Sequence, residues 1–326
     1  MRSDIAIIIP TKNRLDWCLL RAKFHMNSNF TGLLLFVDSS DLDRSVEFMA
    51  YATSLEKTNI AYYHIENLGV HQAIEFGLNL IRNSYKYVVI SGDDDFHLPK
   101  GLYDSASFLD REIEYFAVCG PAIISRFRID NTKAKILSSS NYWTKRAILD
   151  TDPFNRFNTI VRDYYNLEFS LKHVGKYSEI VKEVNSIFLD SSFKASTTSE
   201  YCSSVAIALE GKIAWIDSPF LIRGEHLLRP NSFSGNANLD LNLQGELHKR
   251  NLLIGAFIQK RYSDSIPDFS ISEYCTILDA KDESQLCLKK SEIEKIRILN
   301  FFLRVKRRSI SIYLRLRYRR YFRWFA

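Results

Sequence analysis

The sequence predicts an α/β fold with a mostly parallel, Rossmann-like sheet flanked by helices, and three observations support this prediction. Short apolar runs recur at residues 5–9, 33–37, 60–65 and 87–90. Polar turns and segments long enough for helices separate them, at residues 14–26, 42–55 and 70–82. With 326 residues, 46% of them hydrophobic, the chain can bury a large core. The repeated strand–helix order favours parallel strands joined by right-handed crossovers.

The pattern continues less regularly after residue 95. Strands are expected at 115–119, 122–129 and 212–216, helices at 166–174, 177–185 and 198–209, and a loop at 223–226. A stretch rich in Asn, Ser and Gly at 230–243 suggests a boundary, after which helix-forming residues dominate. We therefore predict one domain over residues 1–235 and a helical extension over residues 236–326.

The composition argues against several classes of protein. The five cysteines are odd in number and widely spaced, which favours neither a disulfide framework nor a zinc site. The amino terminus does not look like a secretory signal. The longest stretch without Asp, Glu, Lys or Arg covers 14 residues, 24–37, too few for a membrane-spanning helix. Neither GxGxxG nor GxxxxGK[ST] occurs, so no glycine-rich phosphate loop is expected.

Three consecutive aspartates, Asp93, Asp94 and Asp95, follow the apolar run 87–90 and the pair Ser91-Gly92. This position corresponds to the carboxyl edge of an open α/β sheet, which is where such sheets bind their ligands. Carboxylates this close together repel one another unless protons or a cation neutralise them. The triplet therefore predicts a cation site, and a solvated turn is the alternative.

Two other strand ends carry polar groups on the same edge. The first strand ends in Pro10-Thr11-Lys12-Asn13-Arg14, and the second ends in Val37-Asp38-Ser39-Ser40. Together with the aspartates, these groups predict one ligand site formed by several strand ends.

Several pieces of the chain resemble the family 2 glycosyltransferases, which have the GT-A fold. IIIPTKNR is similar to the family's first strand and turn, VDSSD to its nucleobase-contacting strand end, and SGDDDF to its metal-binding DxD motif. The segment 67–77 resembles the family's N-x-G segment, with Glu75 where Asn is usual. Glu200, the Gly211-Lys212 turn, Arg223 and His226 resemble the catalytic acid and the R-x-H ending, although Tyr201 stands where the family commonly has Asp.

The resemblance implies transfer of a sugar from a nucleotide diphosphate, with UDP favoured, and with inversion at the anomeric carbon. It implies a divalent metal, Mn²⁺ or Mg²⁺, at Asp93, Asp95 and His226. Glu200 is the expected general base, with Asp163 and Asp190 as substitutes. The expected donor-binding residues are Pro10, Thr11, Asn13, Arg14, Asp38, Asn67, Gly69, His71, Asp93, Asp94 and Arg223.

Structural roles remain alternatives for four of these residues. Asp94 would then only orient its turn, Asp38 would be a strand-end turn residue, His71 would be a core histidine, and Glu200 would cap a helix. A nucleotidyltransferase, or a degenerate glycosyltransferase-like binding module, is the alternative function. The first of these would be expected to have a glycine-bearing first loop, whereas residues 10–14 contain no glycine.

The carboxyl-terminal segment is strongly basic. Residues 295–326 contain eleven Lys or Arg and no Asp or Glu, in a chain whose net charge is +6. As a helix this segment would be amphipathic, which predicts binding to an anionic membrane surface from the cytoplasmic side and suggests a lipid-linked or glycan acceptor in cell-surface polysaccharide synthesis. The alternatives are a helix that packs on the body of the protein and, less favoured, a nucleic-acid contact.

Overall fold

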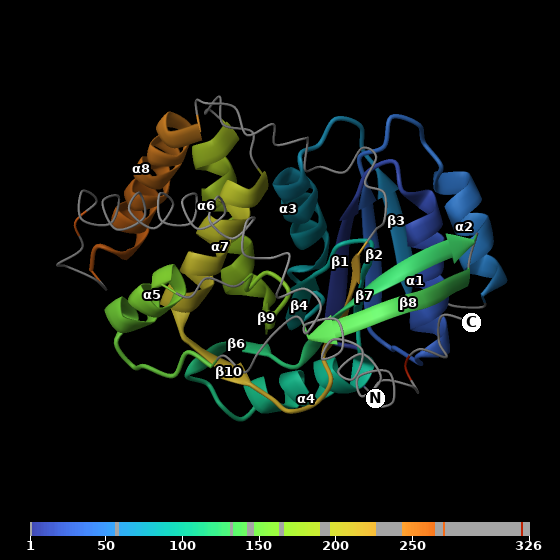
Figure 1. The fold of residues 1–326 in the computed structure, drawn as a ribbon, viewed down its shortest axis with the longest axis horizontal. Helices are drawn as coiled ribbons and strands as arrows, with labels where there is room; N and C mark the ends of the chain where they lie inside the picture. The colour runs from blue at the N-terminus through green and yellow to red at the C-terminus, as the bar shows by residue number, and fades with distance from the viewer. Residues whose placement is uncertain are drawn as a thin grey trace, which may run out of the picture.

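The structure is a computed structural model, and it describes residues 2–55, 59–130, 133–141, 147–162, 166–189, 196–225, 243–264, 270 and 321. Its helices surround two β-sheets (Figure 1).

The central sheet has seven strands in the order β10-β6-β9-β4-β1-β2-β3. Its strands are β1 (Ile5–Thr11), β2 (Leu33–Asp38), β3 (Ile60–His64), β4 (Tyr87–Ile90), β6 (Tyr115–Cys119), β9 (Leu171–His173) and β10 (Lys212–Trp215). The first four are mutually parallel, and among the described strands of this sheet only β9 runs antiparallel to its neighbours. This mostly parallel sheet with its helices confirms the α/β prediction. Strand β1 is buried along its whole length, as expected for a strand covered on both faces.

Helices cover both faces of this sheet. They are α1 (Leu15–Asn27), α2 (Ser45–Ser54), α3 (Val70–Ile81), α4 (Pro99–Leu109), α5 (Pro153–Arg162), α6 (Val174–Leu189), α7 (Ser196–Glu210) and α8 (Leu243–Tyr262). Helices α3, α6 and α7 pack against one another, and α1 packs against α2 (Figure 1). Gly77 lets α3 approach the sheet closely, since a Cβ there would lie 2.9 Å from Ile8 Cγ2.

A second sheet has four strands in the order β5-β11-β7-β8. They are β5 (Asp95–His97), β11 (Leu221–Glu225), β7 (Ala122–Asp130) and β8 (Lys133–Asn141). Because β11 pairs antiparallel with β5, Arg223 lies opposite Asp95. The second sheet therefore joins the aspartate loop to a segment well over a hundred residues further along the chain.

Two predictions after residue 95 are wrong. The helix expected at 166–174 is a turn followed by β9, and the loop expected at residue 223 is strand β11. β9 is only three residues long, too short to show a period, and its place comes from pairing with β4 and β6. The helix expected at 177–185 is present but longer, as α6.

Within the predicted helical extension, residues 236–326, the structure describes helix α8 and a few further residues. Helix α8 buries Ile254, Phe257 and Ile258 in the same hydrophobic core as the central sheet. The predicted division at residue 235 lies in the range 226–242, outside the described residues. Among the helices that the structure describes, none is long and apolar enough to cross a bilayer.

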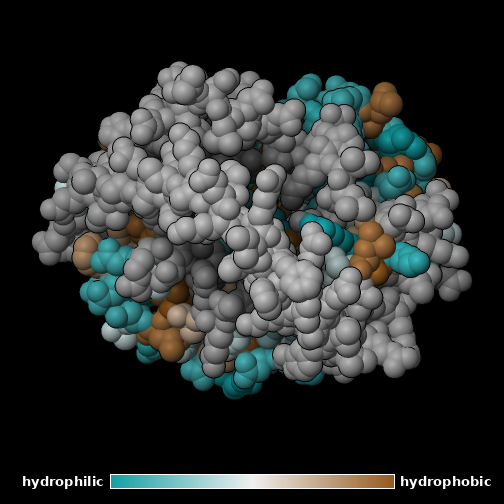
Figure 2. Space-filling model, viewed as in Figure 1, coloured by the Kyte–Doolittle hydropathy of each residue, from teal (hydrophilic) through white to brown (hydrophobic). Residues whose placement is uncertain are grey.

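Within the basic segment, only Tyr321 is described. Its side chain is buried in a cluster that includes Trp17, Phe24 and Phe127. Tyr321 itself therefore packs on the body of the protein, while the other residues of the segment lie outside the described ranges. In the coloured parts of the face shown in Figure 2, at the lower left and the right, hydrophobic and hydrophilic atoms lie next to one another.

Candidate active site

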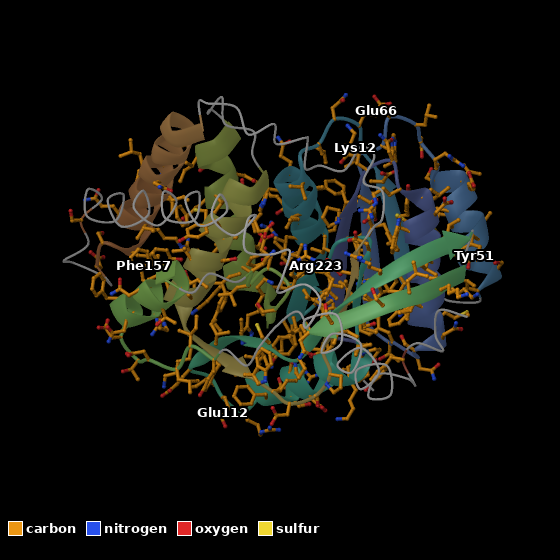
Figure 3. The ribbon with its side chains drawn as sticks, viewed as in Figure 1. Lys12, Tyr51, Glu66, Glu112, Phe157 and Arg223 are labelled. Atoms are coloured by element: carbon orange, nitrogen blue, oxygen red, sulfur yellow. The ribbon has the colours of Figure 1, made fainter. Side chains whose placement is uncertain are left out.

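A cleft of about 730 Å³ lies at the carboxyl ends of β1, β2 and β4. One wall comes from residues 10–18, 38, 40–42, 44, 62, 70, 74 and 90–95, and the other from Asn166, Glu168, Phe169, Glu200 and Arg223. Figure 3 shows Arg223 near the middle of the molecule, between the central strands and helices α6 and α7. The sheet edge predicted from the sequence is therefore the edge that carries the cleft.

The aspartate loop is held by close backbone contacts. At Gly92 a Cβ would lie 2.9 Å from both Asp94 Oδ1 and Asp95 Oδ2, so the carboxylates fold back over a residue that has no side chain. On the other side, the backbone N–H of Gly224 donates to the carbonyl oxygen of Asp94 at 2.8 Å. The position of the loop is thus fixed by both sheets.

Asp93 has partners on both carboxylate oxygens. Thr11 Oγ1 donates to Oδ2 at 2.7 Å, and Arg14 Nη1 lies 2.6 Å from Oδ1. The same guanidinium contacts Asp94 Oδ2 through Nη2 at 3.0 Å, and it stacks over the ring of Trp17. Thr11 and Arg14, which were predicted to bind the donor, therefore contact the aspartates directly.

Asp95 differs from Asp93. Its Oδ1 is buried and accepts no hydrogen bond from any residue that the structure describes. The nearest cation is Arg223, with Nε 3.8 Å away, and this arginine also stacks on Phe169. A buried carboxylate oxygen without a hydrogen bond is costly unless a ligand contacts it. Asp95 is therefore the candidate metal ligand whose oxygen is most available for coordination.

Burial changes the acidity of the two outer aspartates. It raises the pKa of Asp93 to about 7 and the pKa of Asp95 to about 7. Arg14 opposes this rise at Asp93, and Arg223 opposes it at Asp95. The two arginines therefore offset only part of the cost of burying these carboxylates.

The far end of the same wall is formed around Asp38. The backbone N–H of Ser40 donates to Asp38 Oδ1 at 3.0 Å, and Tyr62 OH donates to Oδ2 at 2.6 Å. Asn13 has a left-handed φ of 56° and hydrogen-bonds Ser40 and Asp41, while Pro10 lines the cleft. Tyr62, in the middle of β3, carried no signal in the sequence, and only strand pairing brings it to Asp38.

Three predicted donor residues lie outside the cleft lining: Asn67, Gly69 and His71. Asn67 has a left-handed φ of 62°, and Gly69 precedes α3, where its N–H donates to Gln72. His71 is buried, with its Nδ1 3.8 Å from Glu168, a residue that does line the cleft. Glu75, the departure from the family pattern, accepts a hydrogen bond from Asn185 on α6. These residues shape the layer behind the site.

The opposite wall contains the predicted base and two residues that the sequence did not indicate. Glu200 Oε1 accepts a hydrogen bond from Asn166 Nδ2 at 2.6 Å, and Asn166 Oδ1 accepts the backbone N–H of Glu168 at 2.8 Å. The Glu168 carboxyl is buried, which raises its pKa to about 7. Asn166 therefore holds two acidic residues at one end of the cleft.

The donor set fits a divalent cation only in part. Within the described ranges, no three His, Cys, Asp or Glu side chains converge as a complete ligand set. Mg²⁺ and Mn²⁺ are commonly bound by one or two carboxylates with substrate phosphates supplying the rest, and the buried Oδ1 of Asp95 suits that arrangement. His226, Asp163 and Asp190 lie outside the described residues.

Comparison with known proteins places this geometry in a family. Residues 6–165 match the model of glycosyl transferase family 2. Among curated proteins, none matches the sequence.

Solved structures of TarS from S. aureus share the fold. The complex of TarS residues 1–349 with UDP-GlcNAc has a TM-score of 0.52 and 14% identity, covering 84% of this chain and 70% of that one. The complex with UDP has a TM-score of 0.51, again at 14% identity, with coverage of 84% and 69%. Against a longer TarS structure, the TM-score is 0.50 at 12% identity, and the chain, with 81% of its own length aligned, spans only 44% of that protein.

Proposed function

We propose a donor, a metal site and a base for this chain, which is a glycosyltransferase with a family 2 domain and the GT-A fold. The donor is a nucleotide diphosphate sugar, with UDP as the nucleotide, and the acceptor is a hydroxyl group. The observation that carries this proposal is the buried Oδ1 of Asp95, which accepts no hydrogen bond from any described residue and lies in a cleft formed by three strand ends.

The nucleoside end of the donor is assigned to Asp38. Its oxygens accept hydrogen bonds from Ser40 and Tyr62, which orient the carboxylate and leave it able to accept one more. Uracil has an N–H on its Watson–Crick edge that can donate a hydrogen bond to a carboxylate. The TarS structures with UDP and UDP-GlcNAc support this choice of nucleotide.

The diphosphate is assigned to the middle of the cleft, where Arg14 and Arg223 provide positive charge. A divalent metal, Mn²⁺ or Mg²⁺, held by Asp95 would neutralise the charge that develops on the leaving diphosphate. Asp93, with Thr11 and Arg14 on its two oxygens, orients this part of the loop. Arg223 lies opposite Asp95 in the second sheet, so β11 sets the distance between this cation and the metal side.

Proton transfer is assigned to Glu200. It lines the cleft in the first turns of α7, and the hydrogen bond from Asn166 fixes its carboxylate. A carboxylate here accepts the proton of the acceptor hydroxyl as that oxygen attacks the anomeric carbon from the side opposite the diphosphate. Such a direct displacement inverts the configuration of the sugar.

The acceptor is proposed to be a glycan or a lipid-linked precursor of a cell-surface polysaccharide, reached from the cytoplasmic face of a membrane. The basic composition of residues 295–326 supports this part of the proposal. Flotation of the chain with anionic vesicles, compared with a chain ending near Lys289, tests it. Equal flotation of the two would contradict membrane binding through this segment.

The donor is tested by a thermal-shift panel of UDP-, GDP-, CDP- and dTDP-sugars, each with Mn²⁺ and with EDTA. We expect one or more UDP-sugars to raise the melting temperature, with a larger shift in Mn²⁺, because a ligand that binds only the folded state stabilises it. Stabilisation by another nucleotide alone, or by none, would contradict the assignment.

A further inference from the structure

Three arginines surround the three aspartates. Arg14 contacts Asp93 and Asp94, Arg223 lies near Asp95, and Arg21 on α1 lies behind the loop. Arg21 is fully buried, with Nη2 donating to Ser91 Oγ at 2.7 Å and its guanidinium over Phe96. Its Nε and Nη1 make no hydrogen bond within the described structure. This buried charge is compensated chiefly by the electrostatic field of the aspartates.

The cluster is therefore close to neutral before any ligand binds. A divalent cation entering alone would add positive charge to a site where arginines already balance the carboxylates, at short range and largely away from water. Each phosphate of a nucleotide sugar carries a negative charge. A metal and a diphosphate that bind together would leave the balance unchanged.

Of the three arginines, Arg14 and Arg223 line the cleft, with side chains 20% and 29% exposed, whereas Arg21 is fully buried. Of these two, Arg14 makes the close contacts, with two aspartates, while Arg223 Nε lies 3.8 Å from Asp95. The contacts of Arg14 with Asp93 and Asp94 are those that an incoming phosphate could replace, because a guanidinium binds phosphate with the same paired geometry. The ring of Trp17 supports the guanidinium from one side.

We propose that Arg14 supplies, in the empty site, part of the positive charge that the metal brings later. It pairs with Asp93 and Asp94, beside the proposed metal ligand Asp95, and turns to the diphosphate when the donor binds. The site then takes up the metal with the nucleotide and binds the metal only weakly alone. This inference rests on the proposed donor and metal, and it makes Arg14 a positioning residue that couples the two.

The test is calorimetric titration of the full chain at pH 8 with MnCl₂ alone, with UDP alone in EDTA, and with each in the presence of the other. We expect Arg14→Gln to bind MnCl₂ alone about tenfold more tightly than the unmodified chain, and UDP alone about tenfold more weakly. The gain in Mn²⁺ affinity caused by UDP should shrink accordingly. Unchanged or weaker binding of MnCl₂ by Arg14→Gln would overturn the proposal.

Two further variants keep this result interpretable. Arg2 is a matched control outside the cleft, since its guanidinium also bridges two carboxylates, Asp4 and Asp110, and stacks on a ring, Tyr87. Arg2→Gln should leave all four titrations unchanged. Arg14→Lys keeps the positive charge but lacks the paired N–H donors of a guanidinium, so we expect an intermediate Mn²⁺ affinity. This variant provides the comparison if Arg14→Gln does not fold. Failure of the unmodified chain to bind UDP would instead contradict the proposed donor and leave the MnCl₂ comparison standing.

Discussion

The two walls of the cleft are built in different ways. On the first wall, residues 10–95, the polar groups pair mostly with one another: Thr11 with Asp93, Arg14 with Asp93 and Asp94, and Tyr62 with Asp38. On the second wall, Asn166, Glu200 and Arg223 come from a turn, a helix and the second sheet. In the proposed mechanism, the first wall binds the donor, and the second places the base and a cation against it. Variants of the first wall should change donor affinity, and variants of the second should change turnover.

The largest expected effect is on the second wall. Glu200→Gln removes the proposed base and should lower the transfer rate by roughly 10³-fold, within the range found for general bases. Donor affinity should not change, because the variant keeps the shape of the side chain. The measurement is transfer from a radiolabelled UDP-sugar, together with UDP calorimetry.

Its control lies on the same helix. Glu210, at the other end of α7, pairs with Arg261 outside the cleft, so Glu210→Gln should retain normal turnover. Turnover by Glu200→Gln equal to that of Glu210→Gln would remove Glu200 from the role of base.

A first-wall variant comes next. In Gly92→Ala the new methyl group must displace the carboxylates of Asp94 and Asp95, since its carbon would lie 2.9 Å from both. Such overpacking costs roughly 1–3 kcal/mol, and we expect Mn²⁺-dependent UDP affinity to fall about 30-fold. Gly175→Ala is the control, because no atom lies within 4 Å of a Cβ there. Equal UDP affinity in the two variants would show that the loop tolerates the shift.

Asn166→Ala should have a smaller effect, again on the second wall. It removes the 2.6 Å hydrogen bond to Glu200 and leaves that carboxylate without its orienting amide. Loss of a hydrogen bond to a charged group is worth about 1.5–3 kcal/mol, so kcat should fall about 20-fold while the affinity for UDP stays the same. Steady-state kinetics would show this division, and a change confined to KM would speak against it.

The smallest expected effect belongs to Tyr62→Phe, which removes the hydrogen bond from Tyr62 to Asp38. We expect UDP to bind about fivefold more weakly, corresponding to about 1 kcal/mol. The neighbouring Tyr63 is half-exposed on the other face of β3, so Tyr63→Phe is a close control. If both variants bind UDP as the unmodified chain does, Asp38 does not need this partner.

The two walls also differ in how many of their residues could be placed from the sequence alone. The ends of β1, β2 and β4 follow apolar runs of parallel strands, so Thr11, Asp38 and Asp93 could be placed on one edge from the sequence. Strand β9 and residue Asn166 could not, since their positions depend on pairing with β4 and β6 and on contacts with α7. The strand containing Arg223 was taken for a loop because its five residues mix apolar, charged and glycine positions, and it forms a strand by pairing between β5 and β7.

Calorimetric titration with UDP of the unmodified chain and of Asp95→Asn, each in Mn²⁺ and in EDTA, tests the central claim most directly. If Asp95 holds the metal that binds the diphosphate, Mn²⁺ will tighten UDP binding to the unmodified chain at least tenfold and will have little effect on Asp95→Asn. Equal tightening by Mn²⁺ in both proteins would contradict the account.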